Sequence, residues 1–120
     1  MTISLWFTAL AAAAAVVLPS NSQSLCGRDY ATIQQLSREL QADKDVTRFP
    51  SRNGVATFFD RKSMTLWWLH SRRGSIAVVT CRRKIATDSG YVDGRVEADC
   101  NGDRTGLCTA QAQRMARVKF

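Results

Sequence analysis

The sequence predicts a small α+β domain in which an N-terminal helix packs on a four-stranded antiparallel meander, followed by a short C-terminal helix and held by two disulfides. Three observations predict this fold. Apolar residues recur at helical spacing early in the chain, short apolar segments separated by turn residues follow, and the chain has four cysteines.

The first segment has the character of an export signal. Residues 1–24 carry no charged side chain, and the run from Ile3 to Leu18 is apolar except for Ser4 and Thr8. A short apolar run followed by small polar residues is typical of a signal peptide, and it is shorter than the ~20 apolar residues of a spanning helix. We predict a signal peptide at 1–24 and a single periplasmic or secreted domain at 25–120, with no membrane span once the signal is removed. An uncleaved anchor is the alternative.

The first element of the mature domain is a helix within residues 28–45. Ile33, Leu36 and Leu40 lie at positions i, i+3 and i+7, with polar residues between them, so they form one apolar face. Asp29 is the predicted N-cap, and the helix is expected to end near Asp43.

A loop and then a meander are predicted after the helix. Pro50 and the pair Asn53-Gly54 mark residues 46–54 as a loop. Short apolar segments separated by turn residues, and by a longer connection at 84–90, predict four strands; these lie at 55–59, 64–70, 75–83 and 91–100. The segment 109–117 reads as a short closing helix capped by Thr109.

The four cysteines predict two disulfides, because an even number in a small exported domain forms a covalent framework. Cys100 and Cys108 bracket a short segment with two glycines and should pair, which leaves Cys26 for Cys81. No two cysteines have the close spacing of a zinc site. We therefore predict no metal ligands and no cofactor.

The turns between the strands fix which side chains share a face. Turns with an even number of residues place Val55, Phe59, Leu66, Trp68, Val79 and Cys81 on one face. This face is expected to join the apolar side of the last strand, Val96 included, in a core with Leu36 and Leu40.

Neighbours on a strand point to opposite faces, so Phe58, Trp67 and Leu69 would form an apolar patch on the second face. Three readings of this patch are open. The segment 46–51 or the C-terminal segment covers it, a second copy of the chain pairs with it as a homodimer, or it binds a ligand or a protein partner.

Basic residues are predicted to gather at one end of the sheet. The chain has 17 basic and 10 acidic residues, a net charge of +7, all of it within residues 25–120. The first turn and the end of the third strand should meet there, and they carry Arg61, Lys62, Arg82, Arg83 and Lys84. This cluster is a candidate anion site, and a solvated strand end is the alternative.

No catalytic residue is assigned. The cysteines are expected to be in disulfides, and no nucleophile or nucleotide-binding motif occurs. His70 is the only histidine, and small secreted ribonucleases share the basic, helix-then-sheet architecture, but Arg95 and Glu97 are predicted on the face opposite His70. The sequence therefore favours a non-enzymatic protein that binds an anionic or envelope partner. The alternative is a ribonuclease-like hydrolase that uses His70.

Overall fold

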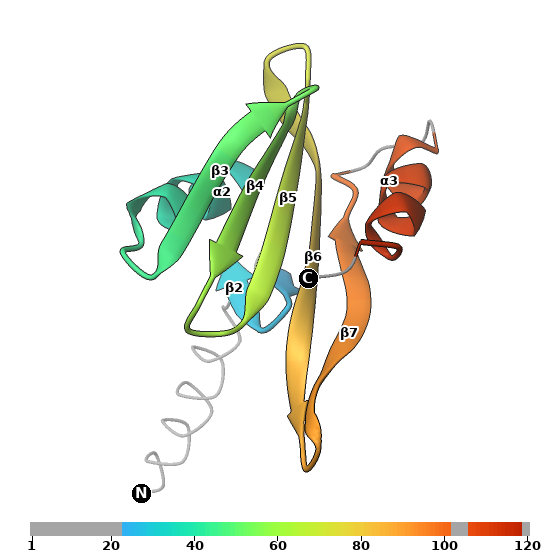
Figure 1. The fold of residues 1–120 in the computed structure, drawn as a ribbon. Coiled ribbons are helices and arrows are strands. Elements are labelled where there is room, and N and C mark those ends of the chain that lie inside the picture. The colour runs from blue at the N-terminus through green and yellow to red at the C-terminus, as the bar shows by residue number, and fades with distance from the viewer. Residues whose placement is uncertain (1–22, 102–105, 119–120) are drawn as a thin grey trace, which may run out of the picture.

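The computed structural model describes residues 23–101 and 106–118 (Figure 1). Nearly all of the predicted signal peptide, residues 1–22, lies outside the described residues. Neither described helix has the length and apolar character needed to cross a bilayer.

The described chain is mostly β-structure. Its elements follow in the order β1 (Gln23–Leu25), β2 (Arg28–Tyr30), α2 (Ile33–Ala42), β3 (Val46–Arg52), β4 (Val55–Asp60), β5 (Thr65–Arg72), β6 (Ser75–Thr87), β7 (Gly90–Asp99) and α3 (Leu107–Met115). β1 pairs with β2, and β3 to β7 form one antiparallel sheet in chain order. The predicted α+β fold, with a helix on a four-stranded meander, is therefore wrong: the sheet has five strands, and a two-stranded sheet precedes the helix.

The fifth strand is β3, in the segment that was predicted to be a loop. β3 lies at the edge of the sheet, where a proline such as Pro50 need not donate a ladder hydrogen bond, and its pairing with β4 is irregular between Phe49 and Arg52. Asn53 and Gly54 have φ angles of 50° and 77° and form a two-residue hairpin turn. The turn was therefore read correctly, but the proline before it does not exclude a strand.

The helix α2 begins later than predicted, because residues 28–30 belong to β2. Thr32 is its N-cap: the Oγ1 atom accepts a hydrogen bond from Gln35 N at 3.0 Å, and Ala31 N donates to Gln35 Oε1 at 2.8 Å. Ile33, Leu36 and Leu40 are the buried residues of the helix, so its apolar face lies where their spacing predicts.

The last two strands and the last helix also differ from the expected bounds. β6 and β7 continue through the predicted connection at 84–90 and form a hairpin that extends past the other strands (Figure 1). The helix α3 begins at Leu107 after Gly106, whose φ angle is 83°, so Thr109 lies inside the helix and is not its cap.

A β-bulge reverses the predicted faces of β6. At the turn, Arg72 pairs with Ser75, but the register shifts between His70 and Ser71, and Ala77 is the extra residue. Beyond the bulge, Trp67 lies opposite Cys81 and Trp68 opposite Thr80. The predicted single face of Trp68, Val79 and Cys81 is therefore wrong, because Val79 and Cys81 share the face of Trp67.

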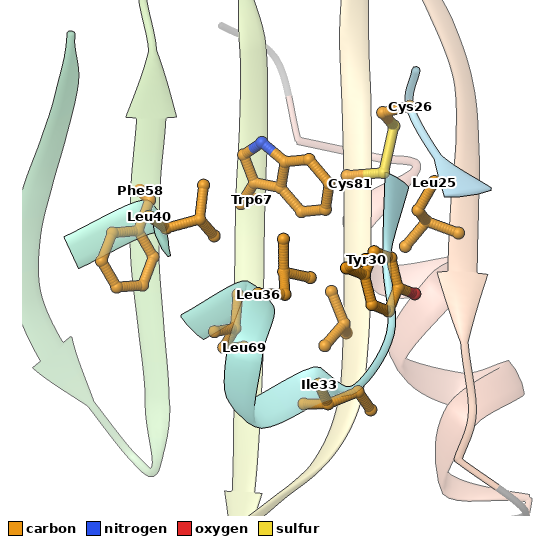
Figure 2. Packing of buried hydrophobic residues seen from close by; sticks show 11 residues of the cluster. Leu25, Cys26, Tyr30, Ile33, Leu36, Leu40, Phe58, Trp67, Leu69 and Cys81 are labelled. Atoms are coloured by element: carbon orange, nitrogen blue, oxygen red, sulfur yellow. A yellow bond between two sulfur atoms is a disulfide. The ribbon is translucent and has the colours of Figure 1, made fainter. Parts of the chain in front are cut away.

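The sheet consequently has a separate core on each face. The larger core lies beneath α2 and the β1–β2 hairpin (Figure 2) and contains Leu25, Cys26, Tyr30, Ile33, Leu36, Leu40, Phe58, Trp67, Leu69, Val79 and Cys81. On the other face Leu66, Trp68 and Met115 are buried together, with Val55, Phe59, Val96 and Val118 packed against them. The residues predicted to form one core are thus divided between two.

Both predicted disulfides are present. Cys26–Cys81 joins the β1–β2 turn to the centre of the sheet, and Cys100–Cys108 joins the end of β7 to the first turn of α3. Two disulfides in a small domain indicate that the protein folds in an oxidising, extracellular or periplasmic compartment.

Candidate functional site

The apolar patch predicted on the second face is not a surface. Phe58, Trp67 and Leu69 are 1%, 1% and 2% exposed and lie beneath α2 (Figure 2). The helix α2 is the main cover; from the segment 46–51, Val46 packs against this core and Arg48 lies over the Phe58 ring. Of the C-terminal segment, the described residues Met115 and Val118 pack on the other face of the sheet. In this fold the three side chains therefore do not form an exposed apolar patch.

The five basic residues predicted to cluster do lie toward one end of the sheet, but Arg82 is used within the fold. It points to the face of Trp68, where its Nε donates to Gly94 O at 2.8 Å. Its Nη1 donates to Ala116 O and Val118 O at 3.0 and 2.9 Å. Arg82 therefore fastens the end of α3 to the sheet and is not a surface cation.

Two further members of this cluster are paired with carboxylates. Lys84 Nζ lies 3.3 Å from Asp93 Oδ1, and Arg83 Nη2 lies 3.7 Å from Glu97 Oε2. Arg61 and Lys62 remain exposed on the β4–β5 turn. The structure thus leaves two of the five predicted basic residues facing solvent without an ion pair in the described part of the chain.

A different basic surface lies at the opposite end of the sheet. There the β3–β4 turn and the β5–β6 turn come together (Figure 1, top), and Ser71 N donates to Gly54 O at 2.7 Å. Arg52, Arg72 and Arg73 are exposed on these two turns. None of the three forms an ion pair with a carboxylate of the described residues.

Arg48 extends this surface along β3 toward α2. Its Cζ lies 5.6 Å from the centroid of the Phe58 ring, and its Nη1 donates to Gln41 Oε1 at 3.3 Å. Both contacts hold the guanidinium in place, and no carboxylate of the described residues pairs with its charge. We name Arg48, Arg52, Arg72 and Arg73 the arginine end.

Two hollows flank the arginine end. One of about 220 Å³ lies between α2 and strands β3 to β5 and is lined by Arg48 and the hydroxyl residues Ser37, Ser51 and Ser71. Another of about 420 Å³ is lined by Arg72 and Arg73. Guanidinium and hydroxyl groups are the donors with which proteins bind phosphate and sulfate oxygens.

A larger hollow, of about 630 Å³, lies between β7 and α3. Small apolar side chains and a disulfide form much of its lining, including Val96, Ala98, Ala112, Ala116 and Cys100–Cys108. Asp93, at one side, is already paired with Lys84. Arg82, Arg95, Thr109 and Gln113 are the other polar residues of the lining, and of these Arg82 is used within the fold.

His70 has no catalytic partner in the described structure. It lies on β5 between Val55 and Val78 on the adjacent strands, and its Nδ1 is buried without a hydrogen-bond partner among the described residues. Glu97 lies on the opposite face, where its Oε1 accepts from Cys26 N at 2.9 Å. His70 and Glu97, the histidine and carboxylate that a ribonuclease would pair, therefore lie on opposite faces of the sheet.

The described residues contain no cluster of three or more His, Cys, Asp or Glu side chains that could hold a metal ion. Comparison with known proteins adds nothing further: no family model, no curated protein and no solved structure matches the chain.

Proposed function

We propose that this protein is an exported, non-enzymatic domain that binds an anionic partner in the cell envelope or outside the cell. In this proposal residues 1–24 are a signal peptide that is removed on export, and the arginine end is the contact surface. The observation that carries the proposal is that Arg52, Arg72 and Arg73 lie at two adjoining turns, with Arg48 further along β3, and that none of the four has a carboxylate partner among the described residues.

The charge of this surface is suited to a polymer or headgroup with closely spaced phosphate or sulfate groups. A guanidinium binds an oxyanion through two parallel hydrogen bonds, and it remains charged at any physiological pH. The net charge of +7 also attracts an anionic partner over a longer range, an effect that salt screens. Binding should therefore weaken steeply as the salt concentration rises.

The proposal is tested by titrating the protein with heparin, a sulfated glycan, at several salt concentrations. The test variant is Arg72→Ser with Arg73→Asn; asparagine suits the positive φ of 54° at position 73. The matched control, Arg61→Ser with Lys62→Asn, removes the same charge from the turn at the other end of the sheet. We expect the test variant to lose about tenfold in affinity and to show a shallower salt dependence, and the control to bind almost as the wild type does.

Equal weakening by both variants would mean that net charge alone, and not the arginine end, causes binding. The enzymatic alternative has its own test: the protein is incubated with RNA before and after His70→Ala. A hydrolytic activity that this substitution abolishes would replace the proposal.

A further inference from the structure

A fourth hollow, of about 430 Å³, lies on the α2 side of the sheet at the end opposite the arginine end. Its walls include Gly27 of the β1–β2 turn and Arg28 of β2, Glu39 of α2, and Ser63 of the β4–β5 turn. The disulfide Cys26–Cys81 fixes the first of these walls to the sheet. The hollow therefore lies at the edge of the larger core, and a disulfide holds one of its walls in place.

Trp67 lines this hollow and has an unmet hydrogen-bonding requirement. The side chain is 1% exposed, and its Nε1 has no partner among the described residues. In Figure 2 the indole nitrogen points away from the leucines of the core and toward the end of the sheet at which the hollow lies. A buried N–H without a hydrogen-bond partner costs free energy. A ligand oxygen that accepts a hydrogen bond from this N–H would remove that cost and so bind more tightly.

The charged groups around the hollow are already largely satisfied. Arg28 Nη2 lies 3.3 Å from Asp60 Oδ2 and 3.3 Å from Asp43 Oδ2, and Lys62 N donates to Asp60 Oδ1 at 3.0 Å. Asp60 is buried, so these bonds are what allow its charge in the interior. Glu39 lies 3.8 Å from Arg28 Nη1 through Oε1 and accepts from Gln35 Nε2 at 3.1 Å through Oε2, and each oxygen can accept a further hydrogen bond. The groups that can still bind a ligand are the donor Nε1 of Trp67 and the acceptor carboxylates of Asp29 and, with its remaining lone pairs, Glu39.

We propose that this hollow binds a neutral, polyhydroxylated molecule, namely a sugar ring. One ring hydroxyl accepts from Trp67 Nε1, and others donate to the carboxylates of Asp29 and Glu39. An anion would face three carboxylates, and the two guanidinium groups nearby, those of Arg28 and of Arg83 beside Gly27, are already paired with carboxylates. A simple cation would leave the indole N–H unpaired. This site is separate from the arginine end and does not depend on the proposed function.

The experiment follows the indole N–H signals in ¹⁵N–¹H spectra, with the Trp67 signal assigned from Trp67→Phe. The probes are glucose, galactose, mannose and N-acetylglucosamine, with glucosamine and glucuronate as charged counterparts. We expect at least one neutral sugar to shift the Trp67 signal in a saturable way and glucuronate to leave it unchanged. A shift with glucosamine alone, or with none of the neutral sugars, would overturn the proposal.

Two variants test the contacts themselves, each by titration with the sugar that binds. Trp67→Phe keeps the ring and removes the N–H donor, and Asp29→Asn removes one acceptor charge at the exposed mouth. Each should lose about tenfold in affinity, the usual effect of a lost hydrogen bond to a charged or buried group. Asp88→Asn, in the β6–β7 turn and outside the lining of the hollow, is the matched control and should bind as the wild type does. Unchanged affinity in both test variants would also overturn the proposal.

Discussion

The side chains of Trp67 and Trp68 leave β5 on opposite faces, and both are buried, at 1% and 5% exposure. Trp67 packs beneath α2, and Trp68 packs with Met115 of α3. An antiparallel sheet commonly leaves one face to solvent, but here each face is covered at least in part by its own helix. Each face also has its own disulfide. Cys26–Cys81 joins the β1–β2 turn, beside α2, to the sheet, and Cys100–Cys108 joins α3 to the end of β7.

Truncation of either tryptophan should destabilise the fold, and Trp67→Ala should do so more strongly. A buried Trp-to-Ala change costs about 3–5 kcal/mol through lost burial and the cavity left behind. Trp67 belongs to the larger core, whereas Trp68 lies in a small cluster that can collapse more readily. Urea unfolding of both variants checks the order. Because neither residue lies at a surface, the midpoints should not depend on protein concentration; a dependence in the wild type that is lost in Trp67→Ala would indicate a self-interface instead.

The two disulfides should contribute unequally. Cys26 and Cys81 are 55 residues apart, and Cys100 and Cys108 are 8 apart. In the chain-entropy model the longer closure lowers the free energy of folding by about 4 kcal/mol and the shorter one by about 2.6 kcal/mol. Replacing each pair with alanines and comparing the unfolding free energies tests the order. A larger loss from the Cys100–Cys108 pair would show that holding α3 in place matters more than closing the long loop.

Two buried threonines should respond in opposite ways to replacement by valine. Thr65 and Thr80 are both 0% exposed on adjacent strands. Thr65 Oγ1 bonds Ser63 O at 3.2 Å and Ser63 Oγ at 2.8 Å, whereas Thr80 Oγ1 has no partner in the described part of the chain. Valine has the same shape, so Thr65→Val should cost about 1–2 kcal/mol and Thr80→Val should be neutral or stabilising by up to about 1 kcal/mol. Thermal melting of the two variants tests this, and equal losses would contradict it.

The local chemistry of the chain predicts part of this fold. The spacing of Ile33, Leu36 and Leu40 identifies the buried face of α2, and the short segment between Cys100 and Cys108 identifies the disulfide pairing. Both features depend on residues close together in the chain. Sequence patterns are most informative at that range.

The number of strands and the faces of the sheet depend on features with no clear local signal. Pro50 argues against a strand unless the strand is known to be at an edge, and that is a property of the whole sheet. The bulge at Ala77 moves every later residue of β6 to the other face. It places Cys81 within reach of Cys26 beneath α2, a long-range requirement that turn lengths cannot show.

The candidate site was missed for the same reasons. Once residues 46–54 are treated as a loop, Arg52 has no defined position beside Arg72, although both adjoin two-residue turns at the same end of the sheet. The residues of the predicted basic cluster do lie together toward one end of the sheet, as expected. Its charge, however, is reduced by pairing, such as that of Lys84 with Asp93 across the β6–β7 hairpin, which only the three-dimensional structure reveals.

The stability of the protein should fall in alkaline solution because of Tyr30. Its phenol is 3% exposed and donates to Asp99 Oδ2 at 2.6 Å. Burial first, and then the hydrogen bond and negative charge of Asp99, raise the pKa of Tyr30 well above its ordinary value. The unfolded chain releases this proton near pH 10 while the folded protein retains it. The stabilisation is therefore complete below about pH 10 and declines above it, by at most about 1.4 kcal/mol per pH unit for one group.

Tyr30→Phe tests this origin of the alkaline loss. The variant should be less stable at neutral pH by about 1–2 kcal/mol, because Asp99 loses its donor, and its stability should fall less steeply above pH 10. Tyr91→Phe is the matched control, since Tyr91 is 59% exposed on the β6–β7 hairpin, and it should keep the wild-type pH profile. Unfolding free energies are measured in urea between neutral pH and about pH 12, a range that spans the ordinary tyrosine value. Parallel profiles for the wild type and Tyr30→Phe would assign the alkaline loss to other groups.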